Sequence, residues 1–352
     1  MKITEIRTRV VQWKGKTVPL PPHFCTNPMD VISPMLTRAT MGTFTFHGWL
    51  ICEVIADNGL VGIGNAALSP LVTKQVIDQY LAPLLLGADP WDTEFLWQHM
   101  YRKTMAFGRK GIAMVAISAV DIALWDLLGK SAKQPVYRLL GGRTKPRIPV
   151  YASRLYSTPL KELASEAKKY KDAGYKAMKL RFGWGPVDGA EGMQKNVALV
   201  RTVRETVGDG IDVMADAYMG WTLDYARRMI PLLEPFRLRW LEEPVIPDDI
   251  QGYATLNKMG RIPIAGGEHE FTALRIGPPF MAVLPERMLY RCVEAAVRPT
   301  PSGPVPARRY VVGVPARGEP GFSFWSDERG IVLESYQGPE PDDPWMRLVD
   351  YE

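Results

Sequence analysis

Three acidic residues recur at a regular interval in the middle of the sequence. Asp216 lies in VMADAY, Glu242 in RWLEEP and Glu268 in AGGEHE, and 26 residues separate each acid from the next. Each acid closes a short apolar run, which is typical of a β-strand that ends in a carboxylate. The carboxyl ends of strands in a parallel barrel open into one mouth. Three carboxylates there repel one another unless they share a cation, and hard oxygen ligands favour Mg²⁺.

A single acid at a strand end has a simpler explanation, because acidic residues often cap the helix that follows. Helix caps need not recur at the same strand end of successive units. The regular spacing of Asp216, Glu242 and Glu268 therefore favours a shared metal site over three separate caps.

Two basic residues lie on the preceding strand-like segment, KAMKLRF. Lys179 and Arg181 are two residues apart, so their side chains are expected on the same face of the strand. If Met178 and Leu180 pack against helices, both cations point toward the acids inside the barrel. The alternative is a pair of solvated charges at a strand end, although strand interiors seldom hold unpaired charge.

An alternation of strands and helices between residues 148 and 269 would position these side chains. The apolar strands lack a polar face, which suits a parallel sheet covered by helices. A doubly wound sheet would show the same alternation, and the acids gathered at strand ends favour a barrel. The predicted strands are 148–153, 175–182, 211–217, 238–244 and 262–269, and the predicted helices are 158–174, 190–208, 222–236 and 248–259.

The first 130 residues indicate a small α+β unit. Residues 1–13 and 47–66 are strand-like, and DNG within the second segment predicts a hairpin turn. Residues 72–100 are expected to be helical. Residues 111–130 are apolar almost all round, which predicts a buried helix with Gly129 at its carboxyl end.

The bulk composition is that of an ordinary soluble globular protein, with 46% hydrophobic and 23% charged residues. There is no run of 18 apolar residues and no signal-peptide core, so we expect neither a membrane span nor secretion. The spacing of Cys25, Cys52 and Cys292 suits neither a metal site nor a disulfide, which favours a reducing cytoplasm.

The net charge of +5 comes from one segment. Residues 271–318 carry seven arginines and two glutamates, so the formal charges of the rest of the chain sum to zero. We therefore expect no nucleic-acid partner.

The chain from Met1 to about Glu270 resembles the mandelate racemase branch of the enolase superfamily. AISAVDIALWDLLGK followed by PVYRLLGG is similar to the family's last capping-domain helix and the entry to its barrel. KLR stands where the family has Lys-x-Lys, and the three acids match its metal triad. The resemblance implies an α/β protein with an N-terminal α+β capping domain (1–130) and an incomplete or atypical TIM-type (β/α) barrel (131–270).

Within that branch the sequence most resembles the acid-sugar dehydratases, the L-rhamnonate dehydratase group in particular. KLRFGWGPVDGAEGM resembles the WGPxDG segment of that group, and DAYMGW and GGEHEF also fit. The resemblance implies Mg²⁺ as cofactor and a small-molecule sugar acid as partner. It also implies that substrate is bound by His23 and Arg38 from capping-domain loops and by Trp184, Tyr218 and His269.

The implied reaction removes the proton beside a carboxylate and expels the β-hydroxyl as water, which gives a 2-keto-3-deoxy acid. Mg²⁺ would stabilise the enolate, a base would take the proton and an acid would assist the leaving group. The resemblance gives the catalytic roles to Lys179 and Arg181. Lys179 would act as a second cation, or as a base if neighbouring positive charge lowers its pKa. Arg181 stays protonated and cannot be an ordinary base.

Several alternatives stay open on the sequence. L-lyxonate or a related aldonate is as suitable a substrate as L-rhamnonate. Another reaction of the superfamily, racemisation or cycloisomerisation, is a second reading, and a non-catalytic metal-binding remnant is a third. Intact relatives form symmetric oligomers, and a homo-oligomer is compatible with this chain.

One part of the family's machinery is missing. The branch uses a histidine on the seventh barrel strand, oriented by an aspartate on the sixth. The histidines here are His23, His47, His99 and His269, and no aspartate lies between Ile250 and Ser326. We therefore expect the activity of this chain to be impaired.

Residues 271–352 also lack the pattern of a barrel half. They hold 12 of the 30 prolines, and proline disrupts both sheets and helices. Only 285–297 suggests a helix and 308–314 a strand. A shifted reading frame is the favoured explanation of this Pro/Arg-rich tail, and divergence into an atypical cover is the alternative. A barrel that lacks its last strands should be poorly soluble.

Overall fold

The computed structural model describes residues 1–12, 21–32 and 48–271, and beyond them the backbone of five strands. The chain divides into two units, Met1–Phe271 and Thr272–Glu352. Among the described residues, the first unit contains two sheets and two separate hydrophobic cores, and the second unit contains one sheet.

The first strands form an antiparallel sheet, in the order β1 (Ile3–Gln12), β2 (Gly48–Ala56) and β3 (Val61–Ala66), and β2 and β3 are the predicted hairpin. The hairpin between β2 and β3 turns at Gly59, whose φ of 80° is one that glycine adopts readily. Alternate residues of β2 are buried, as expected of a sheet with one face on a core.

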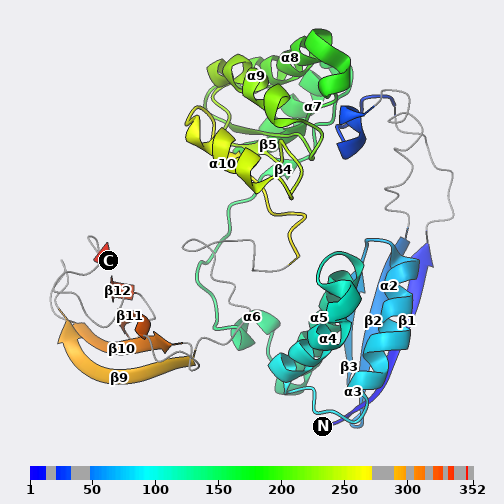
Figure 1. The fold of residues 1–352 in the computed structure, drawn as a ribbon, viewed down its shortest axis with the longest axis vertical. Coiled ribbons are helices and arrows are strands. Elements are labelled where there is room, and N and C mark those ends of the chain that lie inside the picture. The colour runs from blue at the N-terminus through cyan, green and yellow to red at the C-terminus, as the bar shows by residue number, and fades with distance from the viewer. Residues whose placement is uncertain are drawn as a thin grey trace. The chain divides into compact units, whose positions relative to one another are not determined.

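Helices cover this sheet (Figure 1). The predicted helical region is broken by a π-helical turn at Ile77–Leu81. The helices are α2 (Pro70–Val76), α3 (Ala82–Leu85), α4 (Thr93–Gly108) and α5 (Ile112–Ala132).

Helix α5 is the predicted buried helix. It is long and apolar enough to span a membrane, but 61% of its most apolar stretch is buried against the rest of the chain, so it is a core helix. The predicted end at Gly129 was wrong. The helix continues to Ala132, and Lys133 takes the left-handed conformation with φ 51°. The Gly129 carbonyl instead accepts the Gln134 N–H at 2.9 Å, which closes the last turn.

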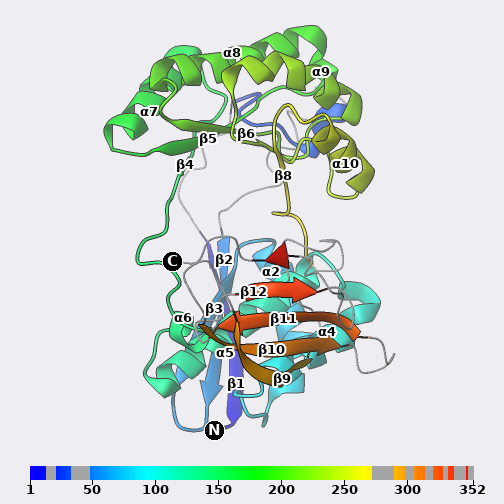
Figure 2. The ribbon, with the colours of Figure 1, turned by 90° about the vertical axis from the view of Figure 1, so that its left-hand side faces the viewer.

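The alternating segments form a five-stranded parallel sheet in sequence order, as predicted. Helices α7, α8 and α9 lie on the same face of this sheet in both views (Figure 2). Among the described residues the sheet does not close, and β4 and β8 are its edges. The strands are β4 (Ala152–Ser153), β5 (Ala177–Arg181), β6 (Asp212–Asp216), β7 (Leu241–Glu242) and β8 (Ile264–Ala265).

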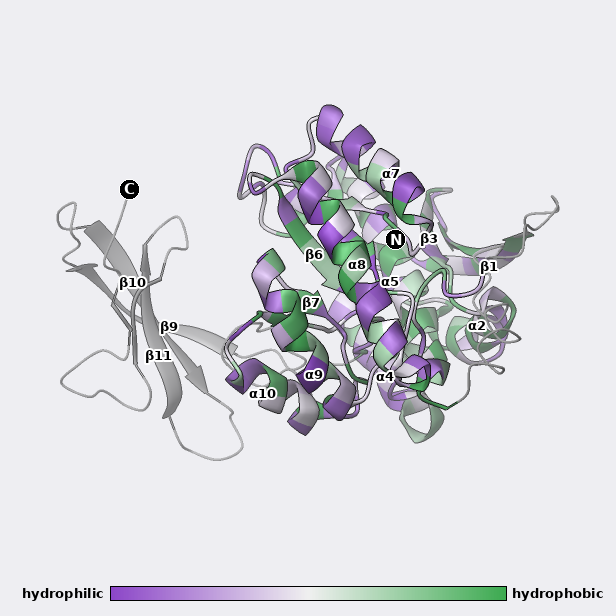
Figure 3. Cartoon of the chain, turned by 90° about the horizontal axis from the view of Figure 1, so that it is seen from above, coloured by the Kyte–Doolittle hydropathy of each residue, from purple (hydrophilic) through white to green (hydrophobic). Residues whose placement is uncertain are grey.

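The helices between these strands are amphipathic. Hydrophilic residues dominate the outer sides of α7 and α8 (Figure 3), whereas Leu163 of α7 and Val200 of α8 are fully buried. The short helix α6 (Val136–Leu139) precedes the parallel sheet. The helices of the sheet are α7 (Leu160–Asp172), α8 (Gly189–Val207), α9 (Leu223–Leu233) and α10 (Ile250–Lys258).

Residues 21–32 lie across the carboxyl ends of the parallel strands. The Phe24 carbonyl accepts the Ser157 N–H at 3.0 Å, and the Thr26 N–H donates to the Phe182 carbonyl at 2.7 Å. The Thr26 hydroxyl donates to the Ala217 carbonyl at 2.7 Å. These bonds tie the N-terminal segment to the ends of three strand regions.

The second unit is an antiparallel sheet with the order β13-β12-β11-β10-β9. The helix predicted at 285–297 was wrong, since residues 289–298 form a strand paired with β10. A short apolar run fits either element, and periodicity alone does not separate them. The strands are β9 (Leu289–Arg298), β10 (Val305–Gly313), β11 (Pro320–Asp327), β12 (Val332–Tyr336) and β13 (Met346–Arg347).

Candidate functional site

The Lys179 ammonium lies between two of the predicted metal ligands. Its Nζ is 2.9 Å from Asp216 Oδ2 and 2.5 Å from Glu242 Oε1, and its side chain is only 4% exposed. Strand register produces this arrangement, because Arg181 pairs with Asp216 and Asp216 pairs with Glu242 on neighbouring strands. The carboxyl ends of β5, β6 and β7 therefore bring one cation and two acids together.

The charged groups of this cluster shift one another's pKa values. Burial lowers the pKa of Lys179, but the attraction of Asp216 and Glu242 outweighs it, so the net shift is upward. Burial raises the pKa of the Asp216 carboxyl, and Lys179 only partly offsets this. In this arrangement Lys179 is an ammonium ion and lacks the lowered pKa that a general base needs.

The cluster fits a hard cation in part. Two carboxylate oxygens converge on one positive group, and the ammonium stands where a cation would be attracted. Glu242 is oriented by Trp240, whose Nε1 donates to Oε2 at 2.8 Å, and Asp216 Oδ1 accepts the Tyr218 N–H at 2.9 Å. Glu268 is exposed, and within the described ranges no three His, Cys, Asp or Glu residues are placed to share a metal ion.

Arg181 presents a buried donor at the edge of this cluster. Its Nη1 has no hydrogen-bond partner among the described residues, and its Nε is 3.9 Å from Asp216 Oδ2. The guanidinium lies over the Tyr156 ring, 5.1 Å from the centroid. A buried, unpaired N–H group beside a cationic side chain can donate a hydrogen bond to an anionic oxygen of a ligand.

His269 contacts a residue that the sequence analysis did not select. Its Nδ1 is 3.0 and 2.9 Å from the two carboxylate oxygens of Glu243, which directly follows Glu242. The Tyr218 ring meets the His269 ring edge to face, with the centroids 5.2 Å apart. The two adjacent acids in LEEP were the sequence signal that could have identified Glu243. Adjacent side chains of a strand point to opposite faces, so the second acid was expected to contact a different residue from the first.

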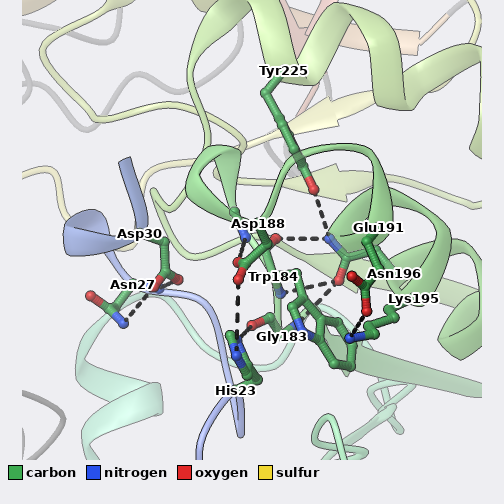
Figure 4. Close-up of polar contacts among 11 residues, drawn as sticks. His23, Asn27, Asp30, Gly183, Trp184, Asp188, Glu191, Lys195, Asn196 and Tyr225 are labelled. Atoms are coloured by element: carbon green, nitrogen blue, oxygen red, sulfur yellow. Dashed lines mark hydrogen bonds and ion pairs between the residues drawn. The ribbon is translucent and has the colours of Figure 1, made fainter. Parts of the chain in front are cut away.

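His23 and Trp184 belong to a different cluster, shown in Figure 4. Their rings stack with centroids 5.4 Å apart. His23 Nδ1 is 3.0 Å from the Gly183 carbonyl, and Nε2 is 3.9 Å from Asp188 Oδ1. Both rings line a cavity of about 430 Å³ that none of the three predicted metal ligands lines.

Asn196 fixes the loop that carries Trp184, and the sequence analysis did not identify it. This fully buried side chain accepts the Gly183 and Trp184 N–H groups at 3.2 and 3.3 Å. Its amide donates to the Trp184 carbonyl at 2.8 Å (Figure 4). A buried asparagine in α8 therefore sets the path of the β5–α8 loop.

Asp30 is a buried acid in the segment 21–32. It accepts the Asn27 N–H at 2.9 Å, closing a capping box around the turn Pro28–Val31 (Figure 4). Burial raises the pKa of Asp30 to about 7, and the negative charge of Asp188 adds to the shift. Arg38, also predicted to bind substrate, lies outside the described residues.

Two family models match the chain. The model for the mandelate racemase / muconate lactonizing enzyme N-terminal domain matches residues 26–141. The model described as enolase C-terminal domain-like matches residues 162–278. The matched ranges thus contain strands β2 and β3 of the N-terminal sheet and strands β5 to β8 of the parallel sheet.

Curated relatives are similar over two thirds of the chain. L-rhamnonate dehydratase of Saccharopolyspora erythraea is 38% identical over 242 residues, which cover 67% of this chain and 58% of that protein. The 3,6-anhydro-alpha-L-galactonate cycloisomerase of Streptomyces coelicolor is 37% identical over 246 residues, 67% of this chain and 65% of that protein. The chain thus spans less than two thirds of the length of these relatives.

Solved structures show the same likeness. The L-rhamnonate dehydratase from Gibberella zeae superposes with a TM-score of 0.66 at 32% identity, covering 76% of this chain and 65% of that one. A racemase from Streptomyces coelicolor A3(2) with bound magnesium gives a TM-score of 0.62 at 33% identity, with coverage of 76% and 69%.

Proposed function

The chain belongs to the mandelate racemase branch of the enolase superfamily, and from that premise we propose that it descends from Mg²⁺-dependent dehydratases of sugar acids. The proposed reaction is hydro-lyase chemistry, in which an L-rhamnonate-like aldonate becomes a 2-keto-3-deoxy acid. The observation that carries the proposal is the convergence of Asp216 and Glu242 on one positive charge at neighbouring strand ends.

The site residues take the following roles in this proposal. Asp216 and Glu242 would hold the metal, with Glu268 as the third ligand expected from the sequence. When bound, Mg²⁺ supplies Lewis-acid stabilisation of negative charge on the substrate carboxylate. The unpaired Nη1 of Arg181 donates a hydrogen bond to an oxygen of the substrate carboxylate in this proposal, and the Lys179 ammonium adds positive charge beside that oxygen. Neither residue supplies a general base in the arrangement described.

We also propose that this activity is weak. This sequence has no histidine after His269 and no aspartate between Ile250 and Ser326, where the histidine and aspartate of the later barrel strands are expected. General acid–base groups contribute factors of roughly 10² to 10⁴ to rate. A cytoplasmic location and a homo-oligomer remain predictions of the same proposal.

Glu242→Gln tests the metal role without a change of shape. We expect MgCl₂ to raise the melting temperature of the wild-type chain and to have little effect on this variant. Exposed Glu205 of α8 provides the matched control Glu205→Gln, which should respond as the wild type does. An equal response of all three chains would overturn the metal role.

Activity needs a separate assay. A semicarbazide assay for 2-keto acids over a library of aldonates should show weak turnover with L-rhamnonate or a close relative, abolished by Glu242→Gln. Stabilisation by Mg²⁺ with no turnover of any acid would favour a non-catalytic metal-binding remnant.

The similarity to a cycloisomerase supports a second candidate. Racemisation, and opening of a 3,6-anhydro ring by expulsion of its β-oxygen, would both begin with removal of the proton beside a carboxylate, so the same cation cluster would serve either reaction. Consumption of a 3,6-anhydro sugar acid without turnover of open-chain aldonates would favour this candidate.

A further inference from the structure

A buried carboxylate holds the ring of His269. Both Glu243 oxygens are within 3.0 Å of His269 Nδ1, and the Glu243 side chain is 2% exposed. The His269 side chain is 20% exposed, so part of its ring reaches solvent. The pair therefore has one buried member and one accessible member.

The backbone around Glu243 is strongly constrained. Its φ is 41°, a left-handed value that non-glycine residues seldom adopt, and Tyr218 and Met219 are also left-handed at the neighbouring strand end. The Glu243 N–H donates to the Ala265 carbonyl at 3.0 Å, and the Met219 N–H donates to the Glu243 carbonyl at 2.7 Å. Non-glycine residues in this region cost energy and gather at functional sites.

This backbone gives two adjacent acids different partners. Glu242 contacts Lys179 and Trp240, whereas Glu243 contacts His269. Glu243 is therefore separate from the predicted metal ligands in its contacts, although it follows one of them in sequence.

The contact also decides which imidazole nitrogen is available. A carboxylate that accepts the Nδ1–H fixes the tautomer and the orientation of the ring. Within the described part of the chain, His269 Nε2 makes no hydrogen bond. The edge-to-face Tyr218 ring restricts the remaining rotation of the imidazole.

We propose that Glu243 is a positioning residue that holds His269 with Nδ1 protonated, so that Nε2 meets a hydroxyl group of the sugar acid. The hydroxyl contact rests on the proposed function, whereas the positioning of the ring does not. A hydroxyl both donates and accepts hydrogen bonds, so either state of Nε2 finds a partner in it. Glu243 thereby contributes to recognition of a polyhydroxylated acid without touching it.

Nitrogen-15 NMR of the imidazole side chains tests the positioning directly in the full chain without ligand. The chain has only four histidines, and His269→Asn assigns the signal. We expect a protonated Nδ1 in the wild type. Glu243→Gln keeps an acceptor and should keep that signature, whereas Glu243→Met removes it and should shift the proton toward Nε2.

The wild-type spectrum decides the positioning even if Glu243→Met fails to fold. An unprotonated Nδ1 in the wild type overturns it, and so does an unchanged His269 signal in a folded Glu243→Met chain. A merely structural contact would alter the melting temperature without selecting one nitrogen.

Addition of L-rhamnonate with MgCl₂ tests the hydroxyl contact. We expect the His269 Nε2 signal to move, and the apparent Kd to rise about tenfold in Glu243→Met but little in Glu243→Gln or in the control Glu205→Gln. Binding that leaves Nε2 unmoved overturns the contact. Absence of binding in every chain overturns the proposed function and the contact with it, while a protonated Nδ1 still upholds the positioning.

Discussion

A buried ammonium between two carboxylates stabilises a fold only while all three charges remain. Lys179→Met would leave Asp216 and Glu242 facing each other at low exposure. Breaking a buried ion pair costs about 3–5 kcal/mol, because the remaining charges lose their compensation. We expect a large fall in melting temperature, and a larger gain on adding MgCl₂ than the wild type shows.

Lys168→Met provides the matched control, because Lys168 pairs with Asp172 on an exposed helix surface. Such exposed pairs contribute no more than about 0.5 kcal/mol. Equal melting temperatures for the two variants would contradict the role assigned to Lys179.

Asp30 gives the fold a dependence on pH. Its pKa rises from 3.8 to about 7 on folding because the carboxyl is buried. The native state therefore binds the proton more tightly than the unfolded state, so stability falls as pH rises from about 4 to about 7. Above pH 7 the loss is complete, and it amounts to on the order of 4 kcal/mol.

Asp30→Asn removes this titration and keeps an acceptor for the Asn27 N–H. Urea unfolding of variant and wild type from pH 4 to pH 8 should give a difference in stability that grows in favour of the variant. A difference that stays constant with pH would show that Asp30 does not titrate in this range.

For single residues, the sequence indicated which side chains could belong to a site better than it indicated which of them lie together. The strand-end rule places Asp216 and Glu242 together, because it depends only on parallel register. Glu268 follows the edge strand β8 at an exposed position, and its part in the metal site stays a prediction. His23 and Trp184 share a cavity of their own because of bonds to Gly183 and Asn196, and local sequence carries no sign of these.

Close approach between a strand and a helix holds the N-terminal region together. A Cβ on Gly64 would lie 1.9 Å from the Ala119 carbonyl oxygen in α5, and one on Gly62 would lie 2.0 Å from that of Ala123. Both neighbours are backbone atoms of a buried helix, so neither can turn aside. Strand β3 therefore packs at a distance that only glycine permits.

Gly64→Ala should destabilise the chain by about 2–4 kcal/mol, because α5 must move away from the sheet. Gly210→Ala is the control, since a Cβ there meets nothing within 4 Å and no left-handed φ is required. Thermal denaturation monitored by circular dichroism measures both. A Gly64→Ala chain as stable as the control would mean that the helix yields at little cost.

Elements were predictable where each segment carried its own period and its own end signals. Helices α7 and α8 are followed by Gly174 and Gly208, both with positive φ, as the sequence indicated. The end of α5 was misplaced by three residues, because the closing hydrogen bonds and not the glycine conformation set it. Strand β9 was missed because its pairing with β10 overrides an ambiguous local pattern.

At the scale of the molecule, the parallel sheet has two edge strands in the part of the chain that the structure describes. Among the described residues, β4 and β8 each have only one neighbouring strand, and Ile148 and Val150 beside β4 are 79% and 70% exposed. Unpaired edges and exposed apolar side chains promote association between chains. We expect light scattering to rise with concentration and Ile148→Lys to reduce it, whereas Leu71→Lys in α2 should not.

The origin of residues 272–352 is testable in the gene. This unit is antiparallel, and the family match ends at residue 278. We expect one of the other two reading frames to encode a histidine-containing strand and further βα units. Absence of such a frame would favour divergence of the tail.

The segment that crosses the strand ends also sets an order of events during synthesis. The Thr26 hydroxyl bonds to the carbonyl of Ala217, 191 residues later in the chain. At about 5–20 residues per second, the segment leaves the ribosome roughly 10–40 s before this partner exists. A pause in translation ahead of codon 217 would prolong that interval, during which chaperones and proteases meet the nascent N-terminus without its final contacts.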